Sequence, residues 1–182
     1  MNASTMSTAS GARIDLLKPD PSQIHLRDIA LSLSRQCRFA GHSLGFYSVA
    51  EHSILVAEHL PQELKLHGLL HDAAEAFTGD LISPVKRWCV NMPLVEFALM
   101  DAIYAALGLG DPPVGSVFEE IRAADLAVGA LECSEFGISI TPGREMLAAE
   151  SLVIRCLEWQ VANSHWLACY ESLRSQATEV AA

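Results

Sequence analysis

Apolar side chains recur along this chain at the three- and four-residue spacing of an amphipathic α-helix. The pattern predicts helices over residues 24–34, 49–60, 61–78, 93–107, 117–136, 144–160 and 164–176. No stretch of useful length shows the strict alternation of apolar and polar residues that is typical of a half-buried strand. The pattern therefore predicts an all-α fold.

A short connection joins the second and third predicted helices. Ser48 and Glu51 have the spacing of a capping box, which opens the second helix. Pro61 follows that helix directly and suits the first turn of the next one. Because the connection is so short, we expect the two helices to lie side by side and antiparallel. Residues on their facing stripes would then meet.

Polar residues interrupt the apolar faces of three predicted helices. His52 lies on the apolar stripe of the second helix, His71 and Asp72 lie within the apolar third helix, and Asp125 lies on the apolar stripe of the fifth. Burying a charged or hydrogen-bonding group without a partner costs several kcal/mol, and Asp is almost never fully buried unless it is paired. A divalent metal ion would compensate all four side chains, which makes them candidate ligands.

The chemistry of this set limits the choice of metal. Two imidazoles and two carboxylates suit one divalent ion of Mn, Fe, Co, Ni or Zn, and are less typical of Mg. Four ligands leave positions on an octahedral ion for water or substrate, as a catalytic site requires. Two alternatives stay open. His67 and His71 lie four residues apart and form a rival ligand pair. The polar residues could instead be hydrogen-bonded core residues of a helical binding domain.

The composition narrows the possible functions. The 182 residues suit one domain, and 22 acidic residues against 12 basic ones give a net charge of −10, which argues against binding to duplex nucleic acid. The five cysteines form no C-x-x-C pair, so we expect reduced thiols in a cytoplasmic protein. No apolar run approaches the ~18 residues of a membrane span. We expect a disordered leader over residues 1–18 and a single helical domain over residues 19–182.

The order of the candidate ligands resembles a known signature. His52, then His71-Asp72, then Asp125 is similar to the motif of the HD-domain metal-dependent phosphohydrolases. Neighbouring segments resemble the branch that includes the bacterial 5′-deoxyribonucleotidases, namely Arg38-Phe39, Glu51-His52-Ser53, His71-Asp72-Ala73-Ala74-Glu75, Thr78-Gly79-Asp80 and Pro84-Val85-Lys86. The resemblance covers about residues 35–128 and implies an HD-domain helical bundle.

The resemblance also implies a role for each matching residue. The ligands of one divalent metal ion would be His52, His71, Asp72 and Asp125. The catalytic residues would be Glu75 as general base or water-positioning group, Arg38 as the group that orients the phosphate, and Asp80. The substrate-binding residues would be Arg38, Phe39, Asp72, Asp80, Ser83 and Lys86.

The activity that the resemblance implies is hydrolysis of a phosphomonoester, such as a (deoxy)nucleoside 5′-monophosphate, by a metal-activated water. Phe39 stands where the branch has Trp, and Ile82-Ser83 replaces Pro-Thr, so the sequence leaves the base and the sugar open. Alternatives are a nucleotide-binding or regulatory module with little turnover, and a phosphodiesterase. Because no His lies between His71 and His165, one metal ion is favoured over the two that some HD diesterases use. The same branch implies a homodimer.

Overall fold

The helical spacing of apolar residues produces helices over most of the chain, which confirms the predicted all-α class. The computed structural model describes residues 4–138 and 152–180. The helices are α1 (Leu26–Arg35), α2 (Val49–His59), α3 (Lys65–Leu70), α4 (Glu75–Thr78), α5 (Ser83–Lys86), α6 (Met92–Leu107), α7 (Gly115–Glu135) and α8 (Trp159–Val180). Short 3-10 helices cover Pro21–Gln23, Arg38–Gly41 and Gln62–Leu64. Among the described helices, none is both long and apolar enough to cross a membrane.

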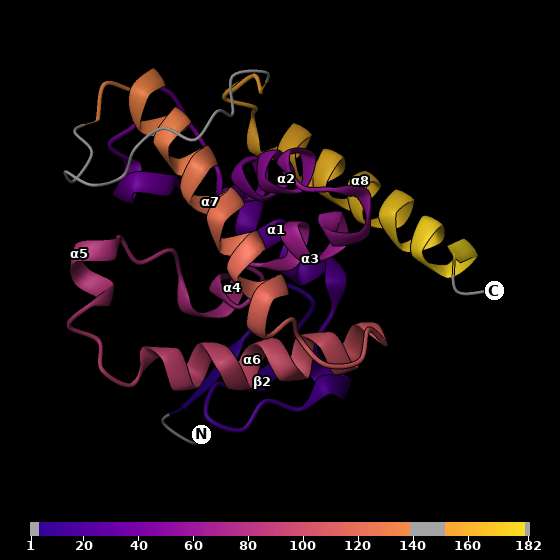
Figure 1. Cartoon of the computed structure of the whole chain (residues 1–182). Helices are drawn as coiled ribbons and strands as arrows, with labels where there is room; N and C mark the ends of the chain where they lie inside the picture. The colour runs from indigo at the N-terminus through magenta and orange to yellow at the C-terminus, as the bar shows by residue number, and fades with distance from the viewer. Residues whose placement is uncertain (1–3, 139–151, 181–182) are drawn as a thin grey trace.

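Helix α2 lies near the centre of the fold (Figure 1) and packs against α3, α7 and α8. Helix α1 also contacts α8 and α4. Helix α6 runs below these helices in the view of Figure 1, and α5 stands apart on the connection that leads to it. Trp166 of α8 is fully buried in the main core.

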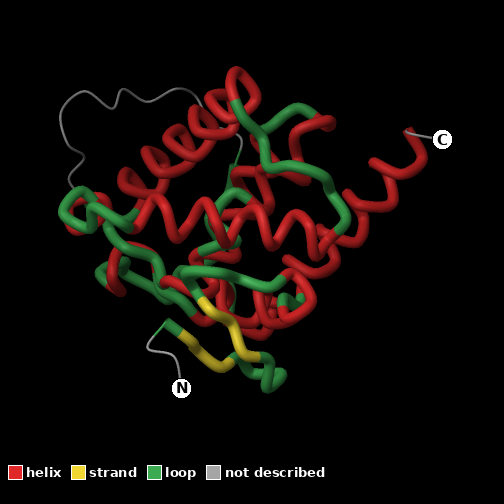
Figure 2. The backbone as a smooth tube through the Cα atoms, turned by 90° about the horizontal axis from the view of Figure 1, so that it is seen from below, coloured by secondary structure: helices red, strands yellow, loops and turns green. Residues whose placement is uncertain are grey.

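The amino-terminal residues form a β-hairpin. Strands β1 (Thr5–Ser7) and β2 (Arg13–Asp15) pair antiparallel, and Figure 2 shows them beneath the helices. Ile14 is fully buried in the main core. The N–H and the hydroxyl of Ser10 both donate to the carboxylate of Asp28 on α1, at 3.0 and 2.6 Å. The prediction of a disordered leader is therefore wrong from residue 4 onward, because core burial and charge-assisted hydrogen bonds fix this segment.

The helix predicted over residues 61–78 is interrupted. Helix α3 ends at Leu70, α4 begins at Glu75, and tight turns lie between them. The N–H of Ala73 donates to the C=O of Leu70, and the N–H of Glu75 donates to the C=O of Asp72, each at 2.9 Å, which is the i to i+3 pattern of a 3-10 turn. This tighter winding changes the directions of His71 and Asp72. The prediction of a continuous helix is thus wrong at the segment that carries the motif.

Helix α2 begins as predicted, because the hydroxyl oxygen of Ser48 accepts a hydrogen bond from the N–H of Glu51 at 3.1 Å. The buried carboxylate of Glu51 does not close the capping box. It accepts hydrogen bonds instead from three successive backbone N–H groups of Arg155, Cys156 and Leu157, at 2.8, 3.1 and 2.8 Å. Converging backbone N–H groups of this kind form an anion-binding nest.

The nest also explains why part of another predicted helix is absent. Residues 152–158 have no regular secondary structure, and α8 begins only at Trp159, so the helix predicted over 144–160 is wrong in this part. Backbone N–H groups that point at the Glu51 carboxylate cannot also donate along a helix. The remainder of that prediction falls on residues 139–151, outside the described residues.

We predict that Glu51→Gln lowers the free energy of unfolding by about 2 kcal/mol. The amide keeps one acceptor oxygen but brings an NH2 group against backbone donors, so at least one buried N–H loses its partner. Urea unfolding followed by circular dichroism measures the change. The control is Glu58→Gln on the exposed face of α2, which should change the free energy by less than about 0.5 kcal/mol. Equal effects of the two substitutions would contradict the anchoring role of Glu51.

Candidate metal centre

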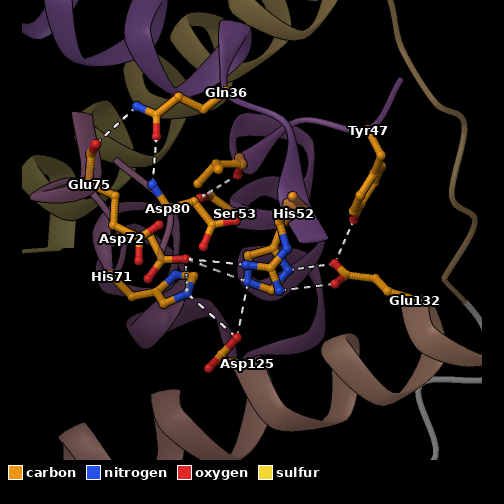
Figure 3. Close-up of polar contacts among 12 residues, drawn as sticks. Gln36, Tyr47, His52, Ser53, His71, Asp72, Glu75, Asp80, Asp125 and Glu132 are labelled. Carbon is orange, nitrogen blue, oxygen red and sulfur yellow. Dashed lines mark hydrogen bonds and ion pairs between the residues drawn. The ribbon is translucent and has the colours of Figure 1, made fainter. Parts of the chain in front are cut away.

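Four side chains from three parts of the fold converge at one point (Figure 3). His52 comes from α2, His71 and Asp72 come from the turns after α3, and Asp125 comes from α7. The Nε2 atom of His52 lies 3.0 Å from Oδ1 of Asp125 and 3.7 Å from Oδ2 of Asp72. The Nε2 atom of His71 lies 3.1 Å from Oδ2 of Asp72 and 3.9 Å from Oδ1 of Asp125. The residues that the helical pattern placed inward therefore meet.

Both imidazoles present the same nitrogen to this cluster. Nδ1 of His71 lies 2.8 Å from the C=O of Gly68, which can only accept, so Nδ1 carries a proton and Nε2 faces the carboxylates. Nδ1 of His52 bonds to the carboxylate of Glu132, with the same consequence. Both Nε2 atoms are buried, and neither has a hydrogen bond of good geometry within the described part of the chain. Such nitrogen atoms, facing carboxylates, are suited to a metal ion.

The geometry and the donor types both fit one ion. The ligand atoms of His52, His71 and Asp72 all lie within 4.8 Å of one another, so this cluster can hold a metal ion. Asp125 adds a second carboxylate to the two imidazoles. Atoms bound ~2.1 Å from one ion lie roughly 3 to 4 Å from each other, and the nitrogen–oxygen distances between these imidazoles and carboxylates are 3.0 to 3.9 Å. His67, the rival ligand, is not part of the cluster, and its Nδ1 lies 3.0 Å from the hydroxyl of Tyr104.

Glu132 was not among the predicted site residues, although it lies in direct contact with His52. Its fully buried carboxylate accepts hydrogen bonds from His52, from the hydroxyl of Tyr47 at 2.6 Å and from the guanidinium of Arg38 at 3.0 Å. Burial alone would raise the pKa of Glu132, but the positive charges of Arg38 and His52 hold it below its ordinary value. The sequence contained a signal, because Glu132 follows Asp125 by seven residues and so shares its face of α7.

Gln36 holds the segment that follows Asp72. Its side chain donates to the C=O of Glu75 and accepts from the N–H of Asp80, both at 2.9 Å. Oε1 of the buried Glu75 lies 3.5 Å from Nζ of Lys86, and its Oε2 has no hydrogen-bond partner among the described residues. Burial, together with the negative charges of Asp72 and Asp80, raises the pKa of Glu75 to about 9. Glu75 is therefore a neutral acid near pH 7 in the metal-free protein.

A cavity of about 560 Å³ lies beside the cluster. The residues with predicted roles that line it are His71, Asp72, Glu75, Lys86 and Asp125. The other residues with predicted roles do not line the cavity; they are Arg38, Phe39, His52, Asp80 and Ser83.

The predicted substrate contacts outside the cavity wall have other surroundings. Arg38 does not line the cavity but contacts the cluster, with its Nη1 atom 3.8 Å from Oδ2 of Asp72. Phe39 packs edge-on against Phe136, with ring centroids 6.1 Å apart. Ser83 is exposed at the start of α5. The structure therefore brings Arg38 to the cluster but places Phe39 and Ser83 away from the cavity.

The fold and the cluster define a mostly helical protein with a site that can hold a metal ion. No family model matches the chain. It is 38% identical over 135 residues to the uncharacterized protein YfdR of Escherichia coli, an alignment that covers 74% of each protein. It is 37% identical over 137 residues to an uncharacterized protein of Rhodobacter capsulatus, with 69% of each protein covered. The chain belongs to the family that these two proteins represent.

We predict that Glu132→Gln weakens the binding of a divalent metal about 10- to 100-fold. A neutral amide cannot compensate the charge of Arg38 and also hold the imidazole of His52 in its present orientation. Competition against a chelator of known affinity measures the loss. Glu135→Gln, an exposed change one turn further along α7, is the control and should leave metal affinity unchanged. Equal affinities of the two variants would show that Glu132 does not orient His52.

We predict that Glu75→Gln stabilises the metal-free protein, and does so more at pH 8 than at pH 5. The folded-state pKa of about 9 lies above the ordinary value of 4.5, so folding becomes less favourable as the pH rises through this window. Glutamine imitates the protonated acid and removes that cost. Thermal unfolding in the presence of a chelator measures both values.

The control for this experiment is Glu63→Gln, at an exposed position before α3. Its effect on the melting temperature should be small and equal at the two pH values. A stabilisation by Glu75→Gln that is no larger at pH 8 than at pH 5 would mean that the pKa of Glu75 is not raised.

Proposed function

We propose that this protein is a metal-dependent phosphohydrolase with an HD-type helical bundle, and that it hydrolyses a phosphomonoester such as a (deoxy)nucleoside 5′-monophosphate. The observation that carries the proposal is the convergence of His52, His71, Asp72 and Asp125, which resemble the HD signature in type and order. Two buried imidazole nitrogens face carboxylates beside a cavity and have no hydrogen bond of good geometry among the described residues, which supports a role in metal binding.

The four converging residues would hold the ion. A divalent ion of Mn, Co, Ni, Fe, Zn or Mg would supply a Lewis acid for the phosphoryl oxygens and would lower the pKa of a water. Without a cation the site is unfavourable for an anion, because the negatively charged carboxylates of Asp72 and Asp125 line the cavity. Binding of the phosphate should therefore depend on the metal.

Three further residues would act on the substrate. Oε2 of Glu75, which is buried and has no partner among the described residues, would accept a proton from the attacking water. A nearby cation favours this role, because positive charge lowers the pKa of a carboxyl group. Nζ of Lys86, 3.5 Å from Glu75 and 2.7 Å from Glu96, would add positive charge at the cavity wall. Arg38, oriented by Glu132, would stabilise charge on the phosphate from behind Asp72.

We predict that the purified protein releases inorganic phosphate from nucleoside 5′-monophosphates in the presence of a divalent metal. A screen of nucleotides and sugar phosphates with Mn, Co, Ni, Zn and Mg, alongside metal analysis, tests this. Asp72→Ala and Asp125→Ala should each lower kcat/KM by about 100-fold or more, exceeding the ~10- to 100-fold typical of residues that only orient ligands.

The matched control is Asp111→Ala, which removes an exposed carboxylate outside the cavity wall. It should retain the activity and the metal content of the wild type. Nucleotide binding without turnover under any of these metals would favour the alternative, a binding or regulatory module. Full activity of Asp72→Ala would exclude the proposed metal centre.

A further inference from the structure

We propose that the part of the cavity between α6 and the first turns of α7 binds a planar aromatic ring, which belongs to the alcohol released when the phosphate ester is hydrolysed. We call this part the aromatic arm and define it by Phe97, Met100, Val114 and Phe118, all of which line the cavity. The inference rests on the proposed function for the phosphate end of the substrate. It assigns recognition to residues that the HD resemblance does not mark.

Two helix faces frame the cavity. On α6 the lining residues are Pro93, Glu96, Phe97, Met100 and Tyr104, with the spacing of one helical stripe. On α7 they include Gly115, Phe118, Arg122 and Asp125, again on one stripe. Figure 1 shows α7 beginning beside α6. The cavity is therefore bounded by two fixed walls, and its volume of about 560 Å³ is typical of small-molecule sites.

The spacing along α7 separates Phe118 of the aromatic arm from the metal centre by a distance that one substrate molecule can span. Phe118 precedes the candidate ligand Asp125 by seven residues, which is two turns, or roughly 10 Å along the helix axis. Both side chains line the same cavity. A substrate whose phosphate reaches the metal centre therefore extends its organic part along α7 towards Phe118.

The aromatic rings of the arm are exposed although they flank a cavity. Phe97 is 61% exposed and Phe118 is 50% exposed. Large apolar groups that stay in contact with water at a cavity wall are typical of ligand sites, because a ligand then buries them. A flat ring gains most from such walls, since every base or arene has a π-face that stacks on an aromatic side chain.

The charges in the cavity fix the orientation of the substrate. Lys86 lies beside Glu75, at the metal end of the cavity, and Arg122 is already paired with Glu119 at 3.4 Å. The aromatic arm itself therefore offers no uncompensated cation to a phosphate. The anionic end belongs at the metal centre, and the uncharged end belongs in the arm.

His67 is an uncharged polar residue of the cavity wall that is not among the candidate metal ligands. His67 stacks on Tyr104, with ring centroids 5.8 Å apart, and its Nδ1 lies 3.0 Å from the tyrosine hydroxyl. Burial lowers the pKa of His67, so the imidazole is neutral. Within the described residues its Nε2 has no hydrogen-bond partner, so it can donate to or accept from a ring edge. The ligand class that combines a flat face with a polar edge is a nucleobase or a related heteroarene.

The first experiment measures binding without turnover. The probe is deoxyadenosine, which has the planar ring and no phosphate, titrated into the full chain and followed by saturation-transfer NMR. We expect binding to the wild type that weakens about tenfold in Phe97→Ala and in Phe118→Ala. The control is Leu94→Ala, which removes a similarly exposed side chain from α6 that does not line the cavity. Because all three side chains are exposed, their melting temperatures should match the wild type.

The second experiment compares kcat/KM for deoxyadenosine 5′-monophosphate with kcat/KM for deoxyribose 5-phosphate, in the presence of metal. We expect a preference for the nucleotide that falls about tenfold in each phenylalanine variant and is kept in the Leu94 variant. Equal turnover of the two substrates, or a preference that the phenylalanine variants keep, overturns the aromatic arm while the phosphohydrolase proposal stands.

The two proposals can fail separately. If no substrate releases phosphate with any metal, the proposed function fails, and the deoxyadenosine titration still tests the aromatic arm. If deoxyadenosine does not bind, or binds the phenylalanine variants as tightly as the wild type, the aromatic arm is overturned whatever the activity.

Discussion

The buried carboxylate of Glu132 holds together the parts of the chain that form the candidate metal centre. It joins α7 to His52 on α2, to the hydroxyl of Tyr47 and to the guanidinium of Arg38. A buried anion is costly unless several donors satisfy it, and a buried pair is strongly destabilised when one partner is lost. Here the donors include a candidate ligand, His52, and the guanidinium of Arg38, which lies 3.8 Å from Asp72. The orientation of His52 and the stability of the surrounding core therefore depend on the same contact.

Helix α2 is fixed from two directions by adjacent residues. Glu51 points to the backbone of residues 155–157, and His52 points to the cluster, as expected for neighbours about 100° apart around a helix. Both contacts involve carboxylates that accept more than one hydrogen bond. A rotation of α2 would break several charge-assisted bonds at once, so the position of its candidate ligand is held by the fold itself. The segment before α8 contributes to the site in this indirect way.

The candidate ligands could be predicted because each depends on local information. His52 and Asp125 stand on apolar stripes, and helical periodicity alone turns them inward. The features that could not be predicted depend on distant partners or on short elements. The acceptor for the N–H of Arg155 is Glu51, 104 residues away. Each strand of the hairpin has three residues, too few for alternation to be visible. The break between α3 and α4 lies inside a pattern that a continuous helix would also satisfy.

Helix α7 would link the proposed recognition of the substrate to the proposed metal centre through one repeated spacing. Phe118, Asp125 and Glu132 follow one another at seven-residue intervals, so one residue of the aromatic arm, the candidate ligand and the buried anchor occupy one face of α7. Because a packed helix moves as a unit, the distance from the arm to the metal centre is set by the helical rise, roughly 10 Å for each interval. Helix α6 contributes mainly apolar side chains to the same cavity. Changes on α6 could therefore reshape the arm without moving the ligands, so in the proposed enzyme the residues that select the substrate would be separate from those that act on it.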